Sequence, residues 1–198
     1  MSKLQEVVGD YNIEDLPIKF TAVAANIEAE KEIWINQGSL LDAIRASISL
    51  PLFFAPYNHN GRVLVDGGVL NPVPIAPTVH DDTDITIAVN LGAEPISGNL
   101  LPKKEKQEVQ KDLKSKIKNY MSNISLPDSI SSENGMHMVA NKSFETMQGT
   151  IAKMKLAAYP ADIEIDIPIN LCGTFEFNRS HDIIEYGYKK CKETMKAT

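Results

Sequence analysis

The chain has 198 residues, of which 43% are hydrophobic and 23% are charged, and its formal net charge is -6. This length suffices for one domain with a buried core, and the acidic balance disfavours nucleic acid as a partner, because phosphate binding needs a basic surface. The chain has only two cysteines and no C-x-x-C pair, which excludes a disulfide framework and a cysteine zinc site. Its first residues contain no apolar segment, which excludes a signal peptide. We therefore expect a protein of the reducing cytoplasm, with any membrane contact peripheral, because no apolar run is long enough to span a bilayer.

The first predicted elements are two strands joined by a short charged link. Residues 18–27 are apolar and rich in β-forming types, and residues 32–36 alternate between apolar and polar types. Both patterns are typical of strands, and the link between them suits a hairpin.

A short helix is predicted after this hairpin. Ser39 followed by Asp42 resembles a capping box, and apolar residues then recur at helical spacing until Pro51, whose ring cannot continue the helix. We expect Phe53 and Phe54 to anchor the loop that follows.

Two further strands are predicted before residue 95. An apolar run at 63–65 ends in Asp66, and residues 84–91 form a nearly continuous apolar stretch, typical of a central strand covered on both faces. Between them, Pro74 stands where a first helical turn can begin.

Two helices are predicted in the second half of the chain. Apolar residues recur every fourth position across 105–121 among lysines, which favours a surface helix; a basic helix that touches anionic lipid is the alternative. A second stripe predicts a long amphipathic helix, whose methionines belong either to the core or to an acyl-chain pocket. That stripe consists of Met136, Ala140, Phe144, Met147, Ile151 and Met154.

The end of the chain predicts one strand and one helix. Residues 163–169 alternate apolar with acidic types, as an edge strand does, and Ser180 is placed to cap a helix that runs to Thr194. The face of that helix expected to pack holds Ile184, Gly187, Tyr188 and Cys191. Strands and helices are mixed throughout, with connections long enough for parallel pairing, so the predicted class is α/β.

Asp66 is the strongest candidate for chemistry, in the stretch GRVLVDGGVLNPVP at 61–74. The sequence contains no G-x-S-x-G, G-x-G-x-x-G or P-loop motif, and its four histidines lack metal-ligand spacing, so we expect no cofactor and no metal. A carboxylate at the end of a strand in an α/β fold lies where such folds bind ligands. Gly67 and Gly68 permit positive φ and close approach of the backbone. The simpler alternative is that D-G-G only forms a tight turn.

The order of these motifs resembles the second half of the domain of bacterial patatin-like phospholipases. The resemblance extends from about residue 16 to about 194 and is carried by A-S-x-x-x-P-x-x-F at 46–54 together with D-G-G-x-x-N-P-x-P at 66–74. It implies a three-layer α/β/α fold with a mainly parallel central sheet, here without its N-terminal strands and nucleophile elbow. It also implies hydrolysis of lipid acyl esters by a serine–aspartate dyad.

By this resemblance Asp66 is the aspartate of the dyad, and Gly67 and Gly68 complete its motif. The family's nucleophilic serine lies in a G-x-S-x-G elbow, after a glycine-rich loop that supplies the oxyanion hole. Neither motif precedes Asp66 here, so we expect the chain to be the C-terminal part of one domain and inactive alone.

Four other side chains lie close in sequence to these motifs. Ser47 lacks flanking glycines and therefore cannot sit on a sharp elbow, so packing or capping is expected of it, and Ser49 is the other serine of the same run. Arg45 either pairs with a carboxylate in the site or projects into water, and the second is favoured. Asn71 is expected to brace the turn after the glycines through backbone hydrogen bonds.

The predicted organisation of residues 1–198 has three parts. A motif-bearing α/β core covers 16–94, a variable loop with the lysine-rich helix covers 95–134, and a helix, an edge strand and a C-terminal helix cover 135–198. The predicted partners are a lipid or acyl-ester substrate and a chain that carries the missing N-terminal segment. The competing hypothesis is a non-catalytic module that binds lipid or such a partner.

Overall fold

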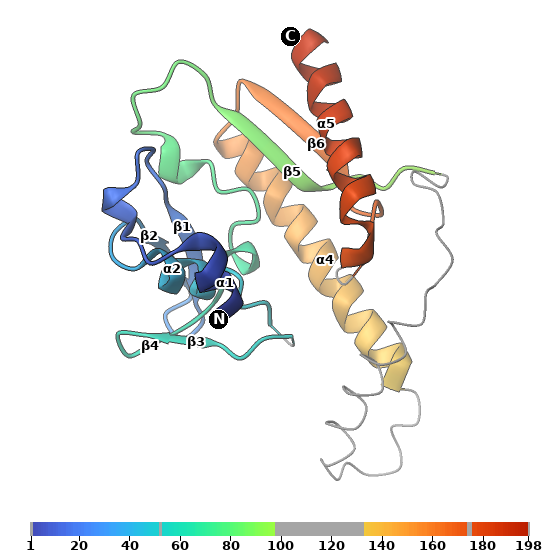
Figure 1. The fold of residues 1–198 in the computed structure, drawn as a ribbon. Helices are drawn as coiled ribbons and strands as arrows, with labels where there is room; N and C mark the ends of the chain where they lie inside the picture. Colours follow the sequence, from blue (N-terminus) through green and yellow to red (C-terminus); the bar gives the residue numbers. More distant parts are fainter. Residues whose placement is uncertain (1, 52, 98–132, 174–175, 198) are drawn as a thin grey trace.

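The structure is a computed structural model that describes residues 2–51, 53–97, 133–173 and 176–197. Its described strands form a four-stranded sheet in the order β2-β1-β4-β3 and a two-stranded sheet of β5 and β6. The strands are β1 (Ala22–Asn26), β2 (Lys31–Ile35), β3 (Tyr57–His59), β4 (Arg62–Asp66), β5 (Ile87–Ala93) and β6 (Ile163–Pro168). The helices are α1 (Ser2–Val8), α2 (Leu40–Ser47), α4 (Glu133–Ala158) and α5 (Ser180–Ala197). Figure 1 shows the two groups of strands and the long α4.

The four-stranded sheet is antiparallel throughout, so the prediction of a mainly parallel central sheet is wrong for this part of the chain. The predicted hairpin is confirmed, because β1 and β2 pair across the short link at 27–30. A second hairpin, β3–β4, turns at Asn60 and Gly61, whose φ values of 53° and 75° are those of a type I′ turn. Chain reversals this short force antiparallel pairing.

Helix α2 covers one face of this sheet, where most of the core lies. The predicted cap is confirmed, because the Ser39 hydroxyl accepts a hydrogen bond from the Asp42 N–H. Small residues such as Ala24, Ala43 and Ala46 let the helix approach the sheet closely. The hydrophobic core between them consists of Ile13, Ala22, Ala24, Ile35, Leu40, Ala43, Ala46 and Leu64. Phe53 and Phe54 are 38% and 49% exposed, so they are not the buried anchors that the apolar run predicted.

The two-stranded sheet is parallel, with α4 in the connection between its strands. Strand β6 alternates as predicted, with Ile163, Ile165 and Ile167 buried against α5. Strand β5 is not covered on both faces, because Val89 is 53% and Leu91 is 68% exposed. The reason is that α4 covers only the face of β5 that carries Ala88. On the other face, which carries Val89 and Leu91, α5 packs on β6 and leaves β5 exposed.

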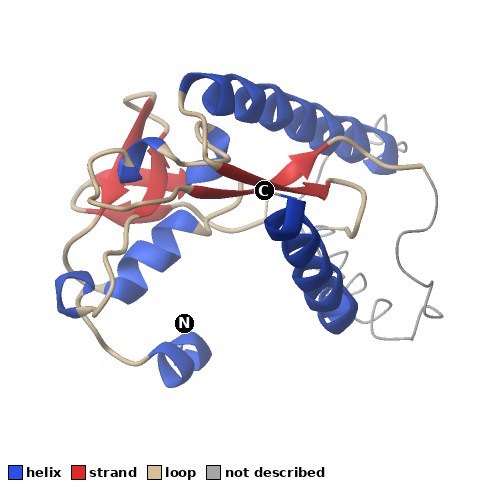
Figure 2. Ribbon diagram, turned by 90° about the horizontal axis from the view of Figure 1, so that it is seen from above, coloured by secondary structure: helices blue, strands red, loops and turns tan. Residues whose placement is uncertain are grey.

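The long helices exist where predicted but present other faces. Helix α4 packs through Ala152 against Ala88 of β5, whereas Met147 and Met154 are 56% and 60% exposed and do not belong to the core. The predicted packing face of α5 is confirmed at Cys191, which contacts the β6 cluster, and wrong at Ile184 and Tyr188, which are exposed. Ile183 and Tyr186 pack against that cluster in their place. Figure 2 shows α4 on one side of the strands and α2 and α5 on the other.

The predicted lysine-rich helix at 105–121 lies outside the described residues. Within the described ranges, no helix is both long and apolar enough to cross a bilayer.

Candidate active site

Asp66 lies at the carboxyl end of β4 and caps the short 3-10 helix Gly67–Val69. Its carboxylate oxygen Oδ1 accepts a hydrogen bond of 2.7 Å from the Gly68 N–H. Its own backbone N–H donates to the Ser49 carbonyl at 3.0 Å, which ties the end of β4 to the segment after α2. The strand therefore ends in a carboxylate whose backbone and side chain are both held in place.

Gly67 is required by close packing. A Cβ atom built on Gly67 would lie 2.3 Å from the Val23 carbonyl oxygen of β1, far inside van der Waals contact. The predicted close approach of the backbone is therefore confirmed at Gly67. The predicted use of positive φ is wrong, because neither Gly67 nor Gly68 is among the glycines with positive φ.

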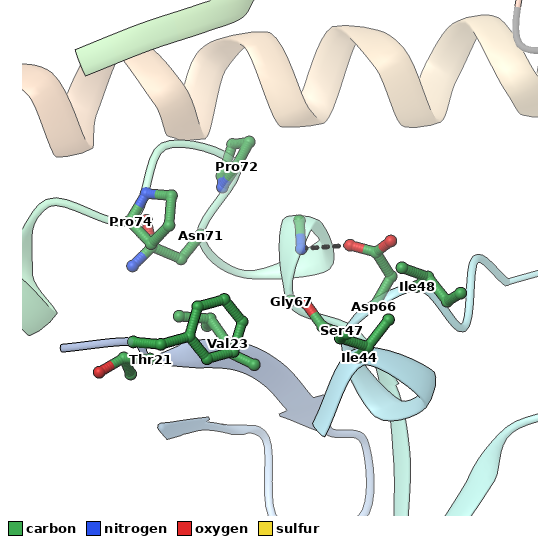
Figure 3. Close-up of a pocket in the computed structure, with 13 residues that line it drawn as sticks. Thr21, Val23, Ile44, Ser47, Ile48, Asp66, Gly67, Asn71, Pro72 and Pro74 are labelled. Atoms are coloured by element: carbon green, nitrogen blue, oxygen red, sulfur yellow. Dashed lines mark hydrogen bonds between the residues drawn. The ribbon is translucent and has the colours of Figure 1, made fainter. Parts of the chain in front are cut away.

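A cavity of about 410 Å³ opens beside Asp66. Its walls are largely apolar and come from β1, α2 and the segment after the glycines (Figure 3). Its lining residues with polar side chains are Thr21, Ser47, Asp66 and Asn71. The apolar lining residues are Phe20, Ala22, Val23, Ile44, Ile48, Pro72 and Pro74. An apolar wall with few polar groups is typical of a pocket for a largely apolar ligand.

Burial raises the pKa of the Asp66 carboxyl above its usual value, and the hydrogen bond from Gly68 opposes that shift. No ion pair to Asp66 exists among the described residues. A carboxylate that is partly desolvated and unneutralised by a cation is a stronger base than one in water. The site can therefore accept a proton from a group that enters the cavity.

Ser47 and Ser49 occupy different environments. Ser47 ends α2 and lines the same cavity as Asp66, but it lies on a helix terminus and not on a strand-to-helix elbow. Ser49 is fully buried and its hydroxyl donates to the Arg45 carbonyl at 2.8 Å. The structure thus brings Ser47 to the pocket and removes Ser49 from it.

Asn71 is 2% exposed, and the predicted backbone hydrogen bond that braces the turn is present, because its N–H donates to the Gly67 carbonyl at 2.9 Å. Its side-chain Nδ2 donates to Glu32 Oε2 of β2 at 2.9 Å, so the side chain contacts a neighbouring strand and not the backbone of the turn. Glu32 also accepts from Lys155 of α4, so this contact joins the turn, the sheet and α4.

Comparison with known proteins gives a family match and several relatives. Residues 1–79, which include the D-G-G motif, match the model of the family described as patatin-like phospholipase. The whole chain is 29% identical to an uncharacterized NTE family protein of Mycobacterium tuberculosis and spans 68% of its length. Over 42% of the chain it is 32% identical to lysophospholipase NTE1 of Kluyveromyces lactis, covering 6% of that protein. Over 46% of the chain it is 30% identical to patatin-like phospholipase domain-containing protein 7 of Mus musculus, covering 7% of that protein.

Residues 1–79 are thus similar to patatin-like phospholipases, and the whole chain is similar to an NTE family protein. An α/β arrangement of helices and sheets is consistent with the patatin fold.

Arg45 neither faces the site nor projects into water, so the favoured prediction for it is wrong. Its guanidinium donates to the Ser49 hydroxyl and, at 3.0 Å, to the Ala55 carbonyl, and it lies 5.9 Å from the centre of the Tyr57 ring. Arg45 thus fastens the loop after α2 to the helix. Arg45 therefore supports the A-S-x-x-x-P segment and does not line the cavity.

Helix α4 contributes a contact that no sequence pattern indicated. The Gln148 Nε2 donates to the Gly68 carbonyl at 2.9 Å, across 80 positions of sequence. A polar residue on a long helix carries no local signal of such a partner, and the apolar stripe pointed to another face of α4.

In the described part of the chain, no cluster of histidine, cysteine, aspartate and glutamate could hold a metal ion.

Proposed function

We propose that this chain is part of a patatin-like serine acyl hydrolase that cleaves lipid acyl esters with a serine–aspartate dyad, in which Asp66 is the base. One observation carries this proposal: the Asp66 carboxylate, partly buried and without a described ion-pair partner, faces a largely apolar cavity of about 410 Å³. The match of residues 1–79 to the patatin-like phospholipase model supports it.

In the proposed mechanism Asp66 takes the proton of the nucleophilic serine as its oxygen attacks the ester carbonyl. A serine hydroxyl is a weak nucleophile until a base removes its proton, and burial makes Asp66 a stronger base than an exposed aspartate. The alkoxide leaving group then receives the proton, and water hydrolyses the acyl-enzyme by the same steps. The apolar walls near Phe20 and Ile48 would hold the acyl chain.

The serine and the oxyanion donors are proposed to come from outside residues 1–198. The sequence has no G-x-S-x-G, and Ser47 at the end of α2 does not stand on an elbow. Preorganised oxyanion donors supply a large share of the rate in acyl transfer, so the chain by itself should be inactive. We further propose that the described elements belong to a three-layer domain whose motif-bearing core covers 16–94, followed by parts at 95–134 and 135–198.

The first test measures hydrolysis of a p-nitrophenyl ester by the 198-residue chain. We expect no turnover above that of buffer and no labelling by a fluorophosphonate, which reacts with activated serines. Turnover that disappears in Asp66→Ala and in Ser47→Ala would show that Ser47 is the nucleophile and overturn the proposal of an external serine.

The second test examines the nucleotide sequence upstream of the Met1 codon. An in-frame G-x-S-x-G would identify the external serine, and the longer protein should then lose about 10²–10⁴-fold in kcat with Asp66→Asn. Unchanged kcat in that variant would remove Asp66 from the dyad.

A non-catalytic binding module is the second candidate, favoured by the exposed apolar side chains of β5. Ile87, Val89 and Leu91 are 49%, 53% and 68% exposed on the face that α5 leaves uncovered. The occupant of this face would be the polypeptide that carries the remaining strands of the domain. Sedimentation of the chain alone distinguishes the two candidates: a monomer at high concentration argues against a partner-binding role.

A further inference from the structure

Helix α4 reaches the turn after Asp66 at two residues, directly at Gly68 and, through Glu32 of β2, indirectly at Asn71. Gln148 donates to the carbonyl of Gly68 at 2.9 Å. Lys155 pairs with Glu32 at 2.5 Å, and Glu32 in turn accepts from Asn71. The two α4 residues are seven positions apart, about two turns, so they project from one face of the helix.

The contact from Gln148 reaches the atoms that hold the Asp66 carboxylate. The Gly68 residue is bound from two sides, because its carbonyl accepts from Gln148 while its N–H donates to Asp66 Oδ1 at 2.7 Å. A Cβ atom built on Gly68 would lie 3.0 Å from both Asp66 Oδ1 and Gln148 Nε2. The two side chains therefore flank the same point, and a side chain larger than hydrogen at this position would displace one of them.

We propose that Gln148 is a positioning residue for Asp66, which it acts on through Gly68 by fixing the turn that orients the carboxylate toward the cavity. The catalytic consequence of this positioning rests on the proposed function, in which Asp66 is the base. The coupling itself is a property of the folded chain and can be measured without a substrate.

A purely structural role for Gln148 makes a different prediction. If Gln148 only fastened α4 to the sheet, any loss of an α4 contact would have the same effect as its own loss. Lys155 provides that comparison, because its contact ends at Asn71 through Glu32 and leaves the bond between Gln148 and Gly68 in place. Thr150 is an exposed α4 residue whose hydroxyl bonds only within the helix, and it provides the neutral comparison.

The experiment is a ¹³C NMR titration of the Asp66 carboxyl in the 198-residue chain, with hydrogen exchange of the Gly68 amide as the second measurement. Gln148→Met keeps the length of the side chain and removes its donor. We expect the pKa of Asp66 to rise above its wild-type value, because the hydrogen bond from Gly68 lowers it and is weakened in the variant. The Gly68 amide should exchange about fivefold faster, as expected for loss of one hydrogen bond.

The controls decide the assignment. Thr150→Ala should leave both measurements unchanged, and Lys155→Met should change the Asp66 pKa less than Gln148→Met does. Gln148→Glu, which keeps the shape and adds a negative charge near Asp66, should raise the pKa further and serves if the methionine variant does not fold. The same Asp66 titration in wild type and in Gln148→Met, or an equal shift in Lys155→Met, would overturn the proposal. Both measurements are made without substrate, so they do not depend on whether the chain hydrolyses esters. A negative result would therefore refute the positioning role of Gln148 without bearing on the proposed function.

Discussion

Replacing Gly67 by alanine tests the close packing that places Asp66. The added Cβ would lie 2.3 Å from the Val23 carbonyl oxygen, 2.6 Å from its carbonyl carbon and 3.0 Å from its Cγ1. Two of these atoms belong to the backbone of β1, which pairs with β2 on one side and with β4 on the other. The clash therefore cannot be relieved by a change of rotamer.

The size of the effect follows from the distance that must be recovered. An ordinary carbon–oxygen contact needs about 1 Å more than the 2.3 Å available, so β1 and the turn must separate by that amount. Overpacking of a well-packed interior costs about 1–3 kcal/mol, and relief through two strands belongs at the upper end of that range. For a chain of this length, about 2–3 kcal/mol corresponds to a decrease in Tm of roughly 4–12 °C.

The assay is urea and thermal unfolding followed by circular dichroism, with Gly187→Ala as the matched control. Gly187 lies inside α5, and apart from its chain neighbours and the surrounding helix backbone no atom lies within 4 Å of a Cβ built on it. Alanine there should stabilise the chain by about 0.5–1 kcal/mol, because glycine is a poor helix former. The two substitutions are chemically identical and have opposite expected signs. Equal unfolding midpoints for Gly67→Ala and wild type would refute the packing argument.

Two further predictions concern charge. Burial raises the pKa of Asp66, so its contribution to stability is complete below the ordinary carboxyl pKa of about 4 and is lost as pH rises through the folded-state value. Asp66→Asn should therefore resist urea better than wild type at pH 7 and match it near pH 3; a less stable variant at pH 7 would contradict this. Burial opposes ionisation of Glu32, but hydrogen bonds from Lys155, Asn71 and Trp34 leave its pKa below the usual value. Its stabilisation is thus present at neutral pH and lost as pH falls through the folded-state value. Lys155→Met should cost about 1–2 kcal/mol at pH 7 and much less near pH 3 in the same urea assay; a cost independent of pH would show that the ion pair is not its source.

The local features of the fold were predictable because their causes lie within a few residues of sequence. The cap at Ser39 needs only the Asp42 N–H, and the β1–β2 hairpin needs only a short link between two apolar runs. The Asn60–Gly61 pair is also a local signal, typical of a hairpin turn, but the β3–β4 hairpin was not predicted from it. The apolar alternation of β6 identified its buried face correctly, because α5 packs against that face.

The partners of side chains in the site could not be predicted in this way. Asn71 reaches Glu32 across 39 positions, and Gln148 reaches Gly68 across 80. The exposed side of β5 was mistaken for a buried one, because an apolar run does not reveal which neighbouring strand or helix is present.

By itself the sequence determined that a carboxylate followed by two glycines ends a strand at residue 66, since strand propensity and turn chemistry are properties of adjacent residues. Only the tertiary structure decided that β4 pairs antiparallel with β1, that Gly67 touches Val23 and that a cavity opens beside Asp66. The physical reason is that pairing direction, close packing and desolvation depend on segments far apart in the chain, whose approach no local pattern specifies.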